Sequence, residues 1–146
     1  MRLNVQSDYA LRLLMHLAVN DDALVTIAEI ASRFDISRAH LMKVAHILGQ
    51  EGLIETVRGR SGGLRLARSA QDVSVGAVVR RMEGDFALVE CFQGGKGECL
   101  ITPACKLKGV LHEAMVAFLA VLDQYTIHDL VTRNSGLKKL LAFEAA

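Results

Sequence analysis

The chain has 146 residues, a formal net charge of +1 and 51% hydrophobic residues, with a single proline. This length suits one domain with a sizeable core, or a small domain with an extension, and the composition excludes global disorder. The longest apolar region, near 110–122, is interrupted by His112 and Glu113 and is too short for a membrane span. Because the N-terminus also lacks a secretion-signal pattern, we expect a cytoplasmic protein with no membrane partner.

The positive charge is concentrated in the first half of the chain. Residues 33–68 contain seven Lys or Arg and three acids, whereas residues 69–146 contain eight Lys or Arg and nine acids. A local excess of positive charge is the expected footprint of a nucleic-acid-binding surface. We therefore look for a DNA contact between residues 33 and 68.

Helical periodicity opens the chain. Apolar spacing predicts a first helix from Ser7 to Asn20, with Ser7 or Asp8 as its N-cap. Thr26 and Glu29 are three residues apart, which predicts a capping box at the start of a second helix that ends at Phe34.

A third helix is expected after a short break. Ser37 is placed to cap it, its apolar residues form one stripe, and the glycines within 49–52 are suited to end it. Two short helices joined by a tight turn are typical of a helix-turn-helix. Next, two β-rich runs, 53–57 and 63–67, flank the basic and glycine-rich stretch 58–62, which predicts a hairpin, or wing. The expected fold class is mainly α with a small β-wing, a winged helix-turn-helix followed by a long helix.

The second half of the chain is expected to form helices before and after a loop that contains the cysteines. Ser74 is expected to cap a helix over 75–83, and Pro103 is expected in the first turn of a long helix that spans 104–125. This helix has two apolar faces, so we prefer a role in pairing two copies to the alternative of a plain core helix. Two short helical pieces should follow, over 126–134 and 137–143. The expected division is a DNA-binding domain, a cysteine loop and a dimerisation region: 1–84, 85–103 and 104–146.

DNA contacts are expected from the start of the third helix and from the tip of the wing. In helix-turn-helix docking the N-terminal end of the second helix approaches the base edges, and a slender basic hairpin suits phosphate or minor-groove contact. The partner would be double-stranded DNA, with a palindromic operator if the protein is a dimer. The candidate residues are Ser37, Arg38, His40, Lys43, Arg58, Arg60, Ser61 and Gly62.

All three cysteines of the chain, Cys91, Cys99 and Cys105, lie within fifteen residues of one another. An odd number of cysteines without a secretion signal favours thiolate chemistry over a disulfide framework. The spacing leaves four interpretations open: buried idle thiols, a thiol–disulfide switch, a zinc site completed by His112 or Glu98, and an iron–sulfur cluster. The sequence contains no motif typical of enzyme catalysis, so we expect a protein that is not an enzyme.

Four segments of the chain together resemble the winged-helix iron–sulfur regulators, and among them the repressors that sense nitric oxide. The match covers nearly the whole chain and is most specific in the wing and in the Ile-Thr-Pro-Ala-Cys stretch. The segments are Ser7-Asp-Tyr-Ala-Leu-Arg12, Asp35-Ile-Ser-Arg-Ala-His-Leu-Met-Lys-Val44, Val57-Arg-Gly-Arg-Ser-Gly-Gly-Leu-Arg-Leu66 and Cys99-Leu-Ile-Thr-Pro-Ala-Cys-Lys-Leu107.

This resemblance implies a homodimeric transcriptional repressor with one 4Fe–4S cluster per subunit, which releases operator DNA when nitric oxide attacks the cluster. The three cysteines would be ligands, and Asp8 from the partner subunit would be the fourth, with Arg12 beside it. From the residues alone, Asp8 is only a helix cap. A 2Fe–2S cluster and a zinc- or disulfide-dependent redox regulator are the alternatives.

Overall fold

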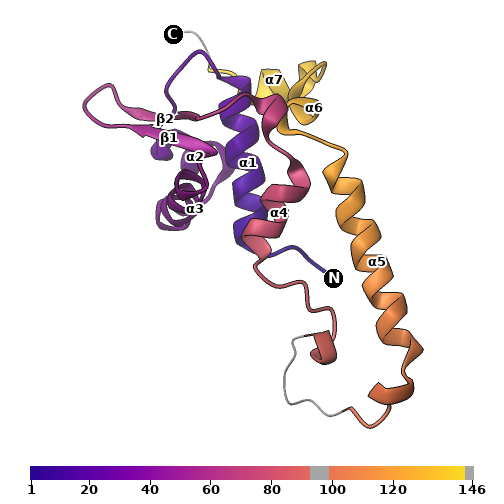
Figure 1. Ribbon diagram of the computed structural model, residues 1–146. Coiled ribbons are helices and arrows are strands. Elements are labelled where there is room, and N and C mark those ends of the chain that lie inside the picture. Colours follow the sequence, from indigo (N-terminus) through magenta and orange to yellow (C-terminus); the bar gives the residue numbers. More distant parts are fainter. Residues whose placement is uncertain (93–98, 144–146) are drawn as a thin grey trace.

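The computed structural model describes residues 1–92 and 99–143 and is mainly helical (Figure 1). One two-stranded antiparallel sheet, β1–β2, stands within these residues. The elements are α1 (Val5–Val19), α2 (Ile27–Phe34), α3 (Arg38–Gln50), β1 (Ile54–Val57), β2 (Gly63–Leu66), α4 (Val75–Glu83), α5 (Lys106–Asp123), α6 (Ile127–Val131) and α7 (Ser135–Leu141). Short 3-10 turns cover Ala70–Asp72, Glu90–Phe92 and Thr102–Ala104. The mainly α fold with a small β-wing confirms the prediction.

Helix α1 is the central element, because α3, α4, α6 and α7 all pack against it. Its N-cap is Asn4, whose side chain accepts a hydrogen bond from the Ser7 backbone N–H at 2.8 Å. The prediction that Ser7 or Asp8 caps this helix is therefore wrong. Both residues lie inside the first turn, and Ser7 is completely buried.

The helix-turn-helix forms as predicted, with one difference. Thr26 and Glu29 make the expected capping box, and α2 ends at Asp35 in the left-handed conformation, with φ 52°. Ser37 occupies the N-cap position of α3, but its side chain makes no capping hydrogen bond. Its hydroxyl is thus left available to another partner, and α3 is held instead by its buried stripe of Leu41, Val44 and Leu48.

The predicted wing is a β-hairpin that is tied to the segment before α2. Ile54 pairs with Leu66 and Thr56 with Leu64. On its other edge Leu64 exchanges two backbone hydrogen bonds with Val25, at 2.7 and 3.0 Å. This third strand-like contact fixes the angle at which the hairpin leaves the body.

A single hydrophobic core lies around α1 and collects side chains from α2, α3, α4, α6 and both strands. Burying one large aliphatic side chain in such a core stabilises the fold by about 1.5–3 kcal/mol relative to leaving it in water. Its largest fully buried aliphatic members are Leu13, Leu14, Leu17, Ile30, Leu41, Leu48 and Ile127.

The end of α5 is fastened to the start of α4. Backbone hydrogen bonds of 2.9 Å run from Val75 N–H to the Tyr125 carbonyl and from Ile127 N–H to the Val73 carbonyl. Arg80 and Asp123 add a two-pronged ion pair, which lowers the pKa of the Asp123 carboxyl through the guanidinium hydrogen bond. A Cβ on Gly76 would collide with Asp123 Oδ1, so any other residue there would force this carboxylate to shift.

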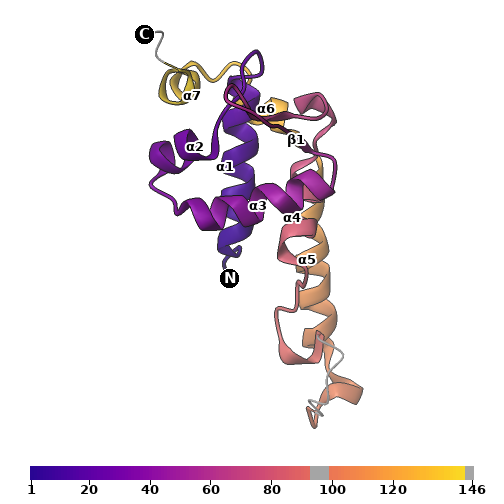
Figure 2. The same ribbon diagram turned by 90° about the vertical axis from the view of Figure 1, so that its left-hand side faces the viewer.

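The long helix differs from the prediction at its start. Thr102–Ala104 is a separate 3-10 turn, Cys105 is extended, and α5 begins only at Lys106. Leu119 is the one buried residue of α5, while several large apolar side chains are exposed: Leu107, Val110, Val116 and Val121. In Figure 2 α5 continues far below the body that contains α1–α4. Across 1–92 and 99–143, no helix is both long and apolar enough to cross a membrane.

The two short helical pieces predicted near the C-terminus are α6 and α7. The first lies within the predicted range 126–134 and has a capping box made by Thr126 and Asp129. The second begins at Ser135, two residues earlier than expected, because Asn134 caps it by accepting the Leu137 N–H.

Candidate functional site

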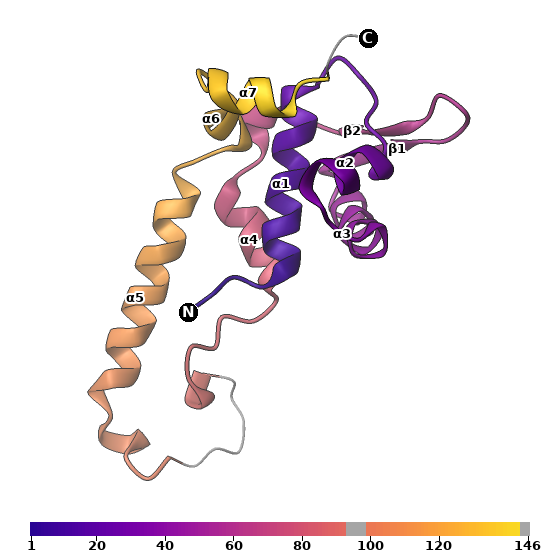
Figure 3. The same ribbon diagram turned by 180° about the vertical axis from the view of Figure 1, so that it is seen from behind.

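The candidate DNA-binding residues gather on one side of the molecule. Figures 1 and 3 show α3 and the wing on one side of α1, with α5 on the other. Ser37, at the N-cap of α3, is exposed, and so are the three candidates in its first two turns, Arg38, His40 and Lys43. The N-terminal end of α3 thus presents a hydroxyl, two cations and an imidazole to solvent, which are suitable groups for base edges and phosphates.

The wing tip carries the remaining candidates. Arg58, Arg60 and Ser61 are exposed, whereas Gly62 is half-buried. A Cβ on Gly62 would collide with the Val57 carbonyl, so the tight turn itself requires glycine at this position. The structure therefore explains Gly62 by the shape of the tip.

Sequence reasoning missed Met42 and His46 as part of this face. Both are exposed, and with Arg58 they line an open groove of about 690 Å³ between α3 and the wing. Their spacing of four residues from Arg38 and from each other places all three along one side of the helix. This spacing alone could have indicated the face, but an apolar residue such as Met42 is normally expected in the core.

The start of α1 contacts both helices of the helix-turn-helix, α2 and α3. The Tyr9 ring lies 6.3 Å, between centroids, from the ring of His40 on α3. The Arg12 guanidinium carbon lies 5.9 Å from the centroid of Phe34, at the end of α2. Movement of this turn of α1 would therefore act directly on α2 and α3.

Asp8 and Arg12 form an ion pair on this same turn. Arg12 Nη2 is 2.7 Å from Asp8 Oδ2, and Arg12 Nε donates to Asp8 Oδ1 at 3.0 Å. The Asp8 side chain is 47% exposed, and a surface pair of this kind contributes only about 0–1 kcal/mol. The carboxylate is thus accessible and weakly held.

Glu83 anchors the first turn of α1 to the end of α4. Its carboxylate accepts the Asn4 backbone N–H at 2.8 Å and the buried Ser7 hydroxyl, and Asn4 Nδ2 donates to the Met82 carbonyl at 2.9 Å. The polypeptide then runs from Glu83 into the cysteine segment. This network fixes the start of α1 to the end of α4, and the segment that carries Cys91 begins directly after that point.

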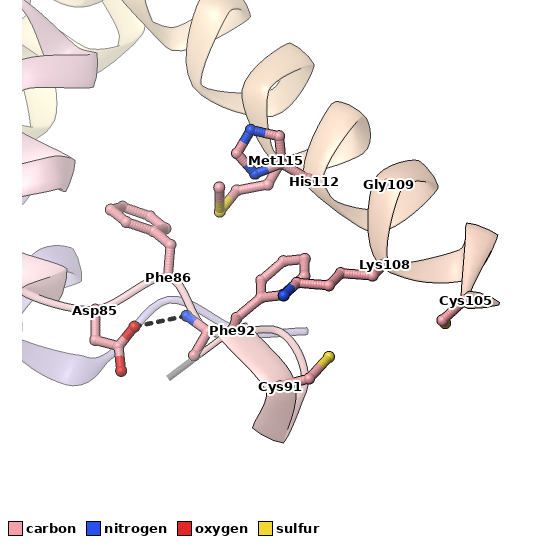
Figure 4. A pocket seen from close by; sticks show the side chains of 10 residues that line it. Asp85, Phe86, Cys91, Phe92, Cys105, Lys108, Gly109, His112 and Met115 are labelled. Atoms are coloured by element: carbon pink, nitrogen blue, oxygen red, sulfur yellow. Dashed lines mark hydrogen bonds between the residues drawn. The ribbon is translucent and has the colours of Figure 1, made fainter. Parts of the chain in front are cut away.

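Cys91 and Cys105 line the same open hollow, although fourteen positions separate them in the sequence. Both line one open hollow of about 690 Å³, here called the cysteine hollow, between the segment after α4 and the start of α5. Figure 4 shows the two side chains on facing sides of it, with Lys108 and His112 projecting from α5. On the side of the hollow formed by the segment after α4, Asp85 accepts a hydrogen bond from the Ala87 N–H at 2.8 Å.

The other expected ligands are not brought into the cysteine hollow. Cys99 is exposed and does not line it, and Asp8 does not line it either. In the part of the chain that the structure describes, no three His, Cys, Asp or Glu side chains converge into a metal-binding group. The three thiols are free, and Glu98 lies outside the described residues.

His112 projects from α5 and lines the same hollow as Cys105, which lies just before the helix in an extended conformation. The His112 ring meets that of Phe92 edge-on at 6.3 Å between centroids. An imidazole therefore lines the same hollow as both thiols and is available as a nitrogen ligand.

Comparison with known proteins places this geometry in context. Residues 3–133 match the family described as "Rrf2: Iron-dependent Transcriptional regulator". The chain is 49% identical over 142 residues to the HTH-type transcriptional regulator NsrR of Bacillus subtilis (strain 168), which covers 97% of both chains. It is 47% identical to NsrR of Shouchella clausii (strain KSM-K16) over 99% of this chain and 97% of that one.

Solved structures show the same fold. The oxidized form of Staphylococcus aureus CymR has a TM-score of 0.73 at 25% identity, covering 90% of this chain and 97% of that one. T. potens IscR has a TM-score of 0.74 at 23% identity, covering 100% and 94%. These likenesses confirm the winged-helix fold and the resemblance seen in the sequence. The chain belongs to the Rrf2 family of transcriptional regulators, which are DNA-binding proteins and not enzymes.

Proposed function

We propose that the protein is a homodimeric repressor that senses nitric oxide through a 4Fe–4S cluster and releases a palindromic operator when the cluster is attacked. The observation that carries the proposal is that Cys91 and Cys105 line one hollow, at the far end of a helix that exposes large apolar side chains. The high identity to relatives named NsrR supports the choice of signal. A regulator of this kind works where the DNA is, in the cytoplasm.

The donor chemistry of the cysteine hollow fits an iron–sulfur cluster. Thiolate sulfur is the usual ligand of such clusters, and the hollow has room between Cys91 and Cys105 for a group larger than a single ion. Cys99, exposed on the same segment, is free to join them. When bound, the cluster supplies iron atoms with which nitric oxide can react. The chain's own residues must hold it and sense its loss.

A second copy of the chain is needed to complete the site. Asp8 does not line the hollow of its own chain, and the bonds from Glu83 to Asn4 and Ser7 hold its helix against α4. Exposed apolar residues along α5, such as Val110 and Val121, provide a surface for pairing with another α5. In such a dimer the accessible carboxylate of Asp8 would serve the partner's thiols.

The contacts of α1 supply a route from ligand to DNA. A carboxylate is a weaker ligand than a thiolate for iron, so the bond from Asp8 is the one most easily lost. Tyr9 and Arg12 lie on the same turn and contact His40 and Phe34 of the DNA-reading helices. Loss of the Asp8 bond would allow this turn to shift, and the two recognition helices would no longer match half-sites about 34 Å apart. On this proposal, residues 1–84 read DNA, 85–103 hold the cluster and 104–146 pair the subunits.

The first test is anaerobic purification followed by iron, sulfide and zinc analysis. We expect a brown protein with stoichiometric iron and sulfide, bleached by nitric oxide. The position of His112 beside both thiols favours one competing candidate, a zinc-dependent regulator. A colourless protein with stoichiometric zinc would reject the cluster and support that alternative.

The second test is Asp8→Ala, with Asp22→Ala as the control for an exposed acid just beyond the other end of α1. We expect Asp8→Ala to retain part of its cluster but to lose most of the difference in operator affinity between untreated and nitric-oxide-treated protein. Asp22→Ala should behave as wild type. If Asp8→Ala still releases DNA on treatment as wild type does, the proposed link through Asp8 is wrong.

A further inference from the structure

His16 is a buried titratable residue that neither DNA binding nor the cysteine hollow uses. It lies in α1 with 1% of its surface exposed, and neither ring nitrogen has a hydrogen-bond partner within the described residues. Its ring meets Phe34 of α2 and Phe143 edge-on, with centroid distances of 6.0 Å to each. Buried imidazoles are normally hydrogen-bonded, so an unsatisfied one calls for an explanation.

The C-terminal segment 135–143 covers this histidine. Figures 1 and 3 show α7 lying across the end of α1. Asn20, also buried, holds the segment in both directions: its Nδ2 donates to the Leu141 carbonyl at 3.0 Å, and its Oδ1 accepts the Phe143 N–H at 3.2 Å. From α2, Arg33 Nη1 donates to the Leu140 carbonyl at 3.0 Å.

We propose that residues 135–143 form a latch on the DNA-binding body and that protonation of His16 releases it. The docked latch places the ring between the edges of Phe34 and Phe143, beside an open hollow of about 580 Å³ that Glu29 and Arg33 also line. Within the described residues neither ring nitrogen has a hydrogen-bond acceptor, so a cationic imidazole is unsatisfied there. Arg33 repels that cation and Glu29 attracts it, both from α2. On α1 the nearest charged residue along this face is Arg12, stacked on Phe34, and the described part of the latch contacts the ring through the uncharged Phe143.

The sign of the pH dependence follows from these contacts. Burial, and after it the charge of Arg33, lowers the pKa of His16 below its ordinary 6.5, against the opposite effect of Glu29. His16 therefore binds a proton more weakly when the latch is docked than when it is released. Docking is fully stable above pH 6.5 and weakens as the pH falls below it, with the docking constant dropping by about tenfold per pH unit between the two pKa values.

Release of the latch would reach the DNA-reading unit directly. Arg33 and Phe34 form the last turn of α2, immediately before the turn into α3. When the latch is docked, Arg33 is tied to α7, and Phe34 shares the His16 ring with Phe143. Acid release frees both residues at once. The latch thus makes the position of α2 depend on pH, independently of any cluster.

The test is the hydrogen exchange of the Phe143 amide in the full chain between pH 7.5 and 5.5, corrected for the intrinsic pH dependence of exchange. We expect protection in wild type to fall as the pH drops below 6.5, by at most about tenfold per pH unit, following the linkage above. His16→Phe, which fits the aromatic surroundings, should keep protection constant over the whole range. The control His46→Gln, an exposed histidine on α3, should behave as wild type.

Three outcomes would overturn the latch. The first is a wild-type protection that does not change with pH, and the second is a His16→Phe variant that loses protection in acid as wild type does. The third comes from an NMR titration of the His16 ring in wild type, which needs no variant to fold: a pKa at or above 6.5 contradicts the inference, and a lower one supports it.

Discussion

The DNA-binding body and the cysteine-bearing arm are stabilised in different ways. The body, residues 1–84 with α6 and α7, holds nearly all of the large buried side chains, including Leu13, Leu14 and Ile127. In the arm, defined as residues 85–92 and 99–123, Leu119 is the one buried side chain of α5, and apolar residues such as Leu107 face solvent. The body buries most of its apolar side chains within the chain, whereas the arm leaves several of its own exposed. On the proposed function, a second copy would cover them.

The largest expected difference is between a core and an arm substitution of the same type. Leu14→Ala removes a fully buried side chain of α1 and should lower the free energy of unfolding by about 2–5 kcal/mol. Leu107→Ala, at 59% exposure, should change it by less than about 0.5 kcal/mol. Urea denaturation of dilute, cluster-free protein measures both values.

Leu107→Ala should have a larger effect than Leu14→Ala in an assay of dimer assembly. Leu107→Ala is expected to weaken dimerisation in sedimentation equilibrium, because it removes apolar area from α5. If Leu107→Ala destabilises the dilute chain as much as Leu14→Ala does, the arm is packed within its own chain and the comparison fails.

Glu83→Ala should have an intermediate effect, because Glu83 joins the body to the arm. The substitution leaves the buried Ser7 hydroxyl and the Asn4 N–H without their acceptor, at a cost of about 1–3 kcal/mol. It should also reduce the effect of nitric oxide on operator affinity, since α1 loses its fixed point. Glu90→Ala, an exposed acid of the arm, is the matched control. An unchanged stability in Glu83→Ala would show that the network is dispensable.

The smallest effect on the fold should come from the wing tip. Arg60→Ala removes one exposed cation and should leave stability within about 0.5 kcal/mol of wild type. If Arg60 contacts a phosphate, the slope of log affinity against log salt should fall by about 1 for any DNA sequence. Lys139→Ala, on α7, should keep the wild-type slope. Equal slopes in all three proteins would remove Arg60 from the interface.

Local signals in the sequence were sufficient for most of the body. Thr26 and Glu29 predicted the start of α2, and the turn residues between β1 and β2 predicted the wing, because capping and turn chemistry depend on neighbours a few residues away. The same reasoning chose Ser7 as the cap of α1, since it could not show that Asn4 is held by Glu83, 79 residues later.

The cysteine site and the latch were harder to predict for the same physical reason. Nothing near Asn20 or Arg33 in the sequence indicates that their partners lie 107 to 123 residues away. Spacing alone did show that the cysteines cluster in the sequence. It could not show which two thiols line one hollow, because that depends on how the segment after α4 returns to α5. The role of Asp8 came from family resemblance and remains a prediction.

The most direct test of the central claim is complementation between two defective chains. Asp8→Ala lacks the proposed fourth ligand, and Cys105→Ala lacks a thiolate. If Asp8 acts across the dimer, a mixed dimer contains one complete site, formed by the thiols of the first chain and the carboxylate of the second. If Asp8 acts within its own chain, the mixed dimer contains no complete site. We predict that purified mixed dimers regain nitric-oxide-dependent release of operator DNA, measured at one salt concentration, that neither parent homodimer shows in full. Mixed dimers no more responsive than the Asp8→Ala homodimer would contradict a site shared between two copies of the chain.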